Sequence, residues 1–139
     1  MKDDAFLPLR LHPGDDLRRA LEAALAGQGC EAGFVAAGMG SLAQAQLRLA
    51  GAPEALRLDG PLEVLTLAGS VAVNGSHLHA SLSDSQGRVL GGHLGYGCRV
   101  RTTAEVLLVL LPQWHFSREA DPATGFDELV PRRRGQPPA

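Results

Sequence analysis

Apolar residues between positions 17 and 25 recur at the spacing of one face of an α-helix. They fill the i, i+3, i+4, i+7 and i+8 positions of this segment, and they are Leu17, Ala20, Leu21, Ala24 and Leu25. Asp15 or Asp16 can cap the start of the helix, where a negative charge also suits the helix dipole. Gly27 or Gly29 can end it. This is the one helix that the sequence predicts.

The rest of the chain predicts short strands divided by turns that contain glycine or proline. Outside residues 76–94, the expected strands span residues 5–12, 33–37, 42–50, 62–73, 98–101, 104–111 and 126–130. Gly38–Ser41 and Asn74–Gly75 are expected turns. The run at 104–111 is apolar except for Glu105, which predicts a strand buried on both faces. Because the helix and the strands are segregated, the predicted fold class is α+β, a single compact domain with one main helix packed on a largely antiparallel sheet.

The stretch from residue 76 to residue 94 predicts a β-hairpin. Asp84 and Gly87 hold the first and fourth positions of a type I turn, so residues 85–87 can form a three-residue loop with a bulge. This loop places Asp84 opposite Arg88. One face of the hairpin is then apolar and the other mostly polar, whereas a slip by one residue would move His93 to the apolar face. The pattern therefore supports both the turn and its register.

Three of the five histidines of the chain lie on the polar face of this predicted hairpin. His79 falls directly opposite His93, and His77 lies diagonal to His93 and within reach of it. Neutral imidazole is a good ligand for divalent transition metals, of which we expect zinc. Three protein ligands leave one coordination position open, and Gly91–Gly92 leave space for an approaching molecule. The alternative is three surface histidines on a solvated sheet face.

Composition and charge narrow the class of protein. The chain has 139 residues, 45% of them hydrophobic, which fits a single globular domain. A net charge of −2 argues against a broad electrostatic surface for nucleic acid but leaves room for a local basic patch. Two cysteines, no signal peptide and no apolar run longer than Val106–Pro112 predict a cytoplasmic protein with reduced thiols and no membrane partner. We expect the domain to span residues 1–130, and residues 131–139 to form a disordered tail rich in arginine and proline.

Five stretches of the chain resemble the PPC domain, a family found in plants and prokaryotes. They cover nearly all of the chain before the tail, in the order of the family, and they are LRLHPGDDL (9–17), GFVAAGMGSL (33–42), GPLEVLTLAGSV (60–71), HLHASLSDSQGRVLGGHLGYGC (77–98) and TTAEVLL (102–108). The resemblance implies a compact α+β domain with a strongly curved sheet that assembles as a homotrimer. Prokaryotic members carry HxH…GGH histidines that suggest a metal site, and His77, His79 and His93 match them.

The family also implies a possible link to DNA. Its plant members join the domain to a separate AT-hook, a short basic segment that enters the minor groove, and its prokaryotic members are labelled candidate DNA-binding proteins. Here Arg134–Pro137 has Gln136 where the AT-hook core Arg-Gly-Arg-Pro has its second arginine, which should weaken minor-groove binding. Arg132 and Arg133 would still attract phosphates. Arg132, Arg133 and Arg134 are therefore weak candidate DNA contacts, and the alternative is a solvated basic tail.

Two carboxylates, Glu63 and Glu105, lie in strand-like apolar surroundings. Either could accept a hydrogen bond from a metal-ligating histidine or act as a general base. Exposure at a sheet edge or an ion pair at a subunit interface is the simpler expectation. Two functions follow from these observations. The first is a DNA-binding or regulatory homotrimer whose metal is structural or senses an unknown small ligand. The second is a metal-dependent hydrolase or lyase with an open three-histidine centre, for which no catalytic residue can be assigned.

Overall fold

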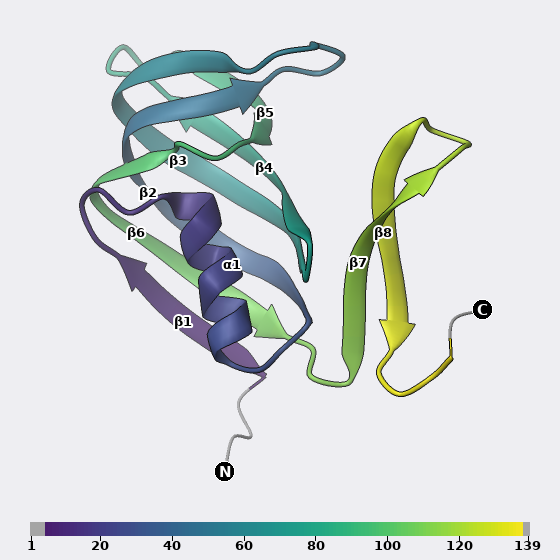
Figure 1. Cartoon of the computed structure of the whole chain (residues 1–139). Coiled ribbons are helices and arrows are strands. Elements are labelled where there is room, and N and C mark those ends of the chain that lie inside the picture. Colours follow the sequence, from purple (N-terminus) through teal and green to yellow (C-terminus); the bar gives the residue numbers. More distant parts are fainter. Residues whose placement is uncertain (1–4, 138–139) are drawn as a thin grey trace.

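The computed structural model describes residues 5–137, which form a curved six-stranded sheet, one helix and a separate two-stranded hairpin (Figure 1). The elements in chain order are β1 (Phe6–Leu11), α1 (Leu17–Gly27), β2 (Ala32–Arg48), β3 (Leu56–Ala72), β4 (Gly75–Ser83), β5 (Val89–Leu94), β6 (Arg99–Leu110), β7 (Trp114–Asp121) and β8 (Phe126–Arg133). The strand order in the large sheet is β1-β6-β2-β3-β4-β5, with antiparallel pairing throughout. The predicted α+β fold class, with one helix on a curved antiparallel sheet, is confirmed.

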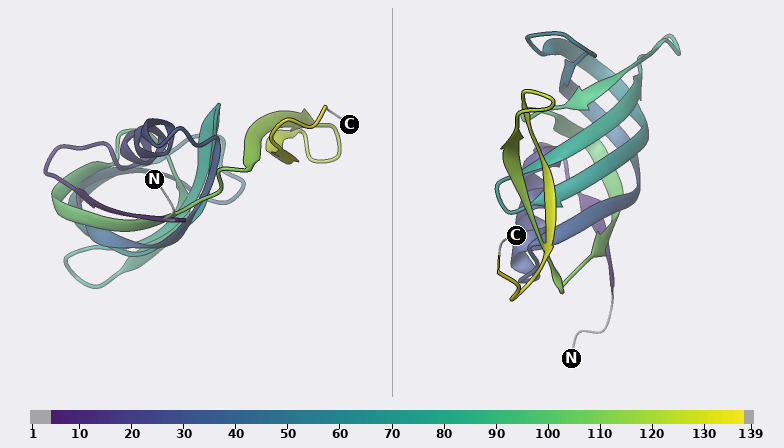
Figure 2. Two further views of the ribbon diagram at one scale, coloured as in Figure 1. Left: turned by 90° about the horizontal axis from the view of Figure 1, so that it is seen from below. Right: turned by 90° about the vertical axis from the view of Figure 1, so that its right-hand side faces the viewer.

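The large sheet curls until its last strand returns to a central one. β2 and β3 are each 17 residues long. Besides its pairing with β3 and β6, β2 pairs with β5, where Leu47 lies opposite Leu94 and Arg48 lies opposite His93. Figure 2 shows the rolled sheet from below, with the helix beside it. Such a sheet has an inner and an outer face, so alternate residues of each strand point into the core.

The helix α1 packs against the inner face of the sheet and begins where the sequence predicts. Asp16 is its N-cap, and the Asp16 carboxylate accepts a hydrogen bond from Arg19 N at 3.1 Å. Leu17, Leu21 and Leu25 are buried, which confirms the predicted apolar stripe. Among the residues that the structure describes, no helix has the length and hydropathy needed to cross a membrane.

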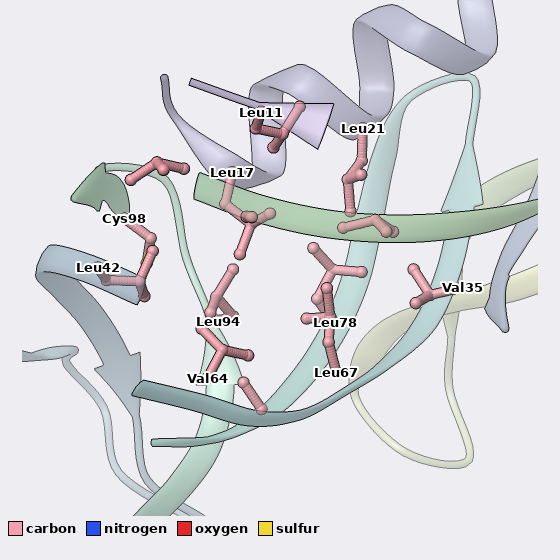
Figure 3. Packing of buried hydrophobic residues seen from close by; sticks show 14 of the residues in the cluster. Leu11, Leu17, Leu21, Val35, Leu42, Val64, Leu67, Leu78, Leu94 and Cys98 are labelled. Carbon is pink, nitrogen blue, oxygen red and sulfur yellow. The ribbon is translucent and has the colours of Figure 1, made fainter. Parts of the chain in front are cut away.

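Inward side chains of the sheet and the helix meet in one large core cluster (Figure 3). In the hairpin of β4 and β5, four inward residues are no more than 5% exposed, and they are Leu78, Ala80, Leu82 and Leu94. They belong to the predicted apolar face of the hairpin. Leu90, which is 43% exposed, is the exception and lies near the turn of the hairpin. Burial of this face keeps the opposite face, which carries the histidines, on the outside of the sheet.

The turn predicted at Gly38–Ser41 is wrong, because β2 runs through these residues as one continuous strand. The glycines serve close packing between strands instead. A Cβ atom at Gly40 would lie 2.5 Å from the carbonyl oxygen of Thr103 on β6, and Gly40 has a φ of +152°, which other residues rarely adopt. A Cβ atom at Gly38 would lie 2.8 Å from Cδ2 of Leu67 on β3.

The strands predicted at 98–101 and 104–111 are one strand, β6. The apolar run in β6 is not buried on both faces, because the core covers only its inner face. Val106 and Leu108 are buried there, whereas Leu107 is half-buried and Glu105 is exposed on the other side. A continuous apolar run is therefore compatible with a strand that has a surface-facing side.

The last two strands form the β7–β8 hairpin, of which the sequence predicts only the segment 126–130. The sequence does not predict β7, because its residues, WHFSREAD, do not alternate regularly between apolar and polar. β8 continues to Arg133, with Pro131 opposite Phe116 and Arg133 opposite Trp114. The tail boundary expected at Pro131 therefore falls inside a strand, because pairing with β7 orders the backbone of Pro131–Arg133. Residues 138–139 of the expected tail lie outside the described residues.

We expect Gly40→Ala to destabilise the protein by about 2–4 kcal/mol, since the methyl group would overpack β2 against β6 at a strained backbone angle. Gly27→Ala is the matched control, because a Cβ atom at Gly27 in α1 meets nothing within 4 Å. This change should be neutral or stabilising by up to about 1 kcal/mol. Urea unfolding followed by circular dichroism measures both free energies of unfolding. Equal stability of Gly40→Ala and the unchanged protein would contradict the packing role of Gly40.

Candidate metal centre

The hairpin that carries the histidines has the predicted turn. Gly87 N donates to the carbonyl oxygen of Asp84 at 3.0 Å, and Asp84 N donates to that of Arg88 at 2.9 Å. The Asp84 carboxylate accepts two further backbone N–H bonds and one from the Arg88 guanidinium, each at 2.9 Å. Gly87 has a φ of +79°, the left-handed conformation that this loop requires. The predicted register is confirmed, with His79 directly opposite His93.

The three histidines form a compact cluster on the outer face of β4 and β5. One ring nitrogen from each of His77, His79 and His93 lies within 4.8 Å of the other two. The ring centroids of His77 and His93 are 5.2 Å apart with the planes at 12°, so these rings are nearly parallel. His79 stands edge-on to both, with centroid distances of 4.9 Å to His77 and 4.7 Å to His93. The structure thus brings together the three residues that the register of the hairpin nominates.

The geometry of the cluster suits a divalent transition metal. Imidazole nitrogen binds zinc at about 2.0–2.1 Å, so two nitrogens on one tetrahedral ion lie roughly 3.4 Å apart. The candidate ligand nitrogens lie within 4.8 Å of one another, so they would have to approach by no more than roughly 1.4 Å to reach this spacing. His77 and His93 are half-buried and His79 is exposed. A fourth coordination position would therefore be accessible from outside the sheet.

Burial lowers the pKa of two of the histidines, which favours the neutral form that binds metals. It lowers the pKa of His77, and the positive charge of Arg118 lowers it further. Burial also lowers the pKa of His93, and Arg48 adds to that effect. The carboxylate of Glu128 acts on the pKa of His77 in the opposite direction. Because only the deprotonated nitrogen has a free lone pair, the lower pKa values favour metal binding near neutral pH.

The cluster opens onto a cavity of about 700 Å³, which we call the histidine cavity. Its walls come from the segment after β2, the β4–β5 hairpin and the β7–β8 hairpin. The lining residues are Arg48, Gly51, Ala52, Pro53, His77, His93, Arg118, Phe126, Asp127 and Glu128. The sequence does not predict that Arg48, Arg118 or Glu128 belongs to the site. Each comes close to the histidines only because distant parts of the chain pack together. No local pattern in the sequence signals those contacts.

The β7–β8 hairpin is held beside the sheet by the turn between β3 and β4. Asn74 Nδ2 donates to the carbonyl oxygen of Arg118 at 2.9 Å, and Arg118 N donates to Asn74 Oδ1 at 2.7 Å. Nearer the start of β7, Phe116 is buried in a small apolar cluster with Ala32 and Ala72. Together these contacts fix the backbone of Arg118 at the edge of the histidine cavity.

The two carboxylates that the sequence nominates lie away from the cluster. Glu63 is opposite Ser83 on β4, which is four residues from His79 and therefore about 13 Å along the strand. Glu105 is on β6, and β2 and β3 separate it from β4. Both glutamates are exposed, although their strands do not lie at an edge of the sheet. Neither is therefore placed to support a histidine ligand.

The three arginines nominated as DNA contacts all have partners within the chain. Arg132 donates to the Glu119 carboxylate at 2.6 and 3.2 Å, and this contact holds the pKa of Glu119 at about 2. The guanidinium of Arg133 lies over the ring of the single tryptophan, 5.0 Å from its centroid. Arg134 Nη2 is 3.5 Å from a carboxylate oxygen of Glu31. Contacts at the base of the β7–β8 hairpin therefore orient all three side chains.

Comparison with known proteins identifies a group that shares this sequence pattern. A family model described as the Plants and Prokaryotes Conserved (PCC) domain matches residues 3–112. The bifunctional protein GlmU of Synechococcus sp. (strain JA-3-3Ab) is 50% identical over 122 residues, which make up 88% of this chain and 20% of that protein. The chain thus spans about a fifth of the length of the curated relatives that it matches.

Solved structures share nearly the whole fold. A hypothetical protein from Salmonella cholerae-suis is 40% identical, with a TM-score of 0.88 over 93% of this chain and 94% of that one. A metal-containing protein from Archaeoglobus fulgidus is 28% identical, with a TM-score of 0.77 over 93% of this chain and 95% of that one. A candidate DNA-binding protein from Bacteroides thetaiotaomicron has a TM-score of 0.82 over 94% of each chain, and its 19% identity shows a common fold alone.

Proposed function

The chain belongs to the Plants and Prokaryotes Conserved (PCC) domain family, and on that premise we propose that it is a metal-binding regulatory domain. His77, His79 and His93 would hold a divalent transition metal, for which zinc is the first choice. The observation that carries the proposal is the convergence of three imidazoles whose candidate ligand atoms lie within 4.8 Å of one another. The neighbour from Archaeoglobus fulgidus, at 28% identity, is itself a metal-containing protein, which supports the same chemistry here.

The metal would be structural or would sense a small ligand, and the surroundings of the histidines favour the second role. A structural centre has all of its positions filled by protein atoms, whereas three histidines leave one position for another molecule. Two of the three histidines, His77 and His93, line a cavity of about 700 Å³, through which another molecule would reach the metal. When bound, the metal would supply a Lewis-acidic position for an oxygen or nitrogen atom of the ligand.

A metal-dependent hydrolase or lyase is the second candidate function, and one residue of the cavity favours it. An enzyme needs an acid or a base near the open coordination position. Glu128 lines the histidine cavity together with His77, and its charge acts on the His77 imidazole. Glu128 would take up or deliver a proton there. An enzymatic activity that survives Glu128→Gln would rule out this role.

We expect protein purified without a histidine tag to contain close to one metal ion per chain. The double variant His77→Ala/His79→Ala should contain almost none, since a single remaining imidazole holds an ion only weakly. Elemental analysis of both preparations by mass spectrometry measures the content. His12→Ala is the matched control, because the exposed His12 ring lies 3.9 Å from Asp15, far from the cluster in the chain. Equal metal in the double variant and the unchanged protein would remove the proposed centre.

We also propose a homotrimer, which the family resemblance implies. An apolar groove on the outer face of β1, β6 and β2 supports a contact between subunits. Its lining includes Pro8, Ala37, Met39 and Leu107, and Met39 is 51% exposed. Exposed apolar patches of this kind mark interaction sites. Light scattering during size-exclusion chromatography should give about three times the chain mass of 14.6 kDa, and a mass near that of one chain would contradict the trimer.

DNA is a further proposed partner. The neighbour from Bacteroides thetaiotaomicron is a candidate DNA-binding protein that shares the fold. Arg133 and Arg134 have partners within the chain but are exposed, so phosphates could still reach them. Arg132 is half-buried against Glu119 and is less accessible. Any contact of this kind would be electrostatic and would read little of the base sequence.

We expect Arg133→Gln/Arg134→Gln to weaken DNA binding about uniformly across sequences. The slope of the logarithm of the binding constant against the logarithm of the salt concentration should become smaller by roughly one per arginine. Mobility shifts at several salt concentrations measure both effects. Deletion of the segment after Val130 is unsuitable because it removes part of β8. Arg57→Gln/Arg88→Gln is the matched control, since it removes the same charge from another surface. No shift by the unchanged protein at physiological salt would exclude DNA as a partner.

A further inference from the structure

We propose that the histidine cavity binds a small organic anion, whose oxyanion group is held by Arg48 and Arg118 while another of its atoms reaches the metal. A carboxylate and a phosphate share the chemistry that would be recognised, because a guanidinium binds either through two parallel hydrogen bonds. The inference rests on the metal centre proposed above and names the class of ligand that this centre would take.

Arg48 lies beside the cluster because of the pairing of β2 with β5. It is directly opposite His93, and side chains of directly opposite residues share a face of the sheet. Arg48 Nη1 donates to the carbonyl oxygen of Ala52 at 3.3 Å, which orients the guanidinium within the segment after β2. No carboxylate among residues 5–137 forms an ion pair with it. Its remaining donors are therefore available to a ligand.

Arg118, on β7, lines the same cavity. Asn74 holds its backbone, and its Nη2 donates to the carbonyl oxygen of Asp127 at 2.7 Å. In the part of the chain that the structure describes, Arg118 also forms no ion pair with a carboxylate. Two arginines thus line one cavity, and the guanidinium of each is held by a backbone carbonyl and not neutralised by a carboxylate.

The charges around the cavity favour an anion when the metal is bound. Arg48 and Arg118 are positive, and a divalent ion on neutral histidines would add two further positive charges. Asp127 and Glu128 line the cavity as well and offset part of this charge. The Glu128 carboxylate accepts from Thr124 Oγ1 at 3.4 Å, next to the turn of its own hairpin. The net charge of the two arginines, the two carboxylates and the divalent ion would be +2, so an anion with one or two negative charges would balance it.

The size and the apolar part of the lining favour an organic ligand. A volume of about 700 Å³ lies within the range of small-molecule sites and far exceeds what a bare oxyanion fills. Pro53 and Phe126 contribute apolar surface to the lining, and Phe126 is 67% exposed, so its ring is free to contact a ligand. A carbon skeleton placed against these residues would cover them while its anionic end meets the arginines.

The test uses the full chain loaded with cobalt(II), whose visible spectrum reports on its ligands. Succinate and inorganic phosphate are titrated separately, and we expect at least one to change the spectrum saturably. Arg48→Gln and Arg118→Gln should each raise the dissociation constant about tenfold or more, because each removes a charge-assisted hydrogen bond. Arg88→Gln is the matched control, since Arg88 is paired with Asp84 at the turn of its hairpin. Arg48→Lys and Arg118→Lys should give intermediate losses.

The outcomes separate this inference from the metal centre. A failure of the unchanged protein to bind cobalt would overturn the centre itself. Cobalt bound by every variant, with anion affinity unchanged in both glutamine variants, would overturn the anion site alone. A spectrum that neither anion alters would do the same. Response to phosphate only, or to succinate only, supports the site and assigns the source of the oxyanion. Circular dichroism confirms that each variant is folded.

Discussion

The backbone contact between β2 and β5 is the constraint on which the candidate site depends. The large sheet has to curl far enough for its last strand to reach a central one, and Gly92 permits the approach. A Cβ atom at Gly92 would lie 2.6 Å from the carbonyl oxygen of Arg48. The contact sets Arg48 opposite His93, so a guanidinium lies beside an imidazole from a different hairpin. The β4–β5 hairpin supplies the histidines, and the curl of the sheet supplies much of what surrounds them.

Features that arise from neighbours in the chain could be predicted from the sequence. The helix follows from its leucine spacing and the Asp16 cap, because these act within a few residues of one another. The His79–His93 pair follows from the Asp84–Gly87 turn in the same way, since a tight turn determines the register of the strands that it joins. The family resemblance independently marks the same histidines. Local geometry was therefore sufficient to locate the cluster.

The glycines of β2 and the walls of the cavity show where local patterns stop being informative. Gly38 and Gly40 are typical of a turn by composition, whereas their role is to leave room for β3 and β6 on either side. Arg118 and Glu128 reach the histidines only because a second hairpin docks beside the sheet. That docking depends on Phe116, which has no distinctive sequence context, and on Asn74, whose turn the sequence predicts but whose contact with β7 it does not. The three candidate metal ligands come from one hairpin, whereas the charged residues around them come from several parts of the fold.

The reciprocal hydrogen bonds between Asn74 and Arg118 join the turn of one hairpin to the backbone of another. The histidine cavity is lined by residues of the β4–β5 hairpin and of the β7–β8 hairpin, so a molecule that bridges these two hairpins also strengthens the docking of the second one. By thermodynamic linkage, the free energy that docking adds to ligand binding equals the free energy that the ligand adds to docking. A ligand bound there would increase the protection of β7 and β8 from hydrogen exchange. Occupancy of the site and the docking of the last two strands are therefore thermodynamically coupled.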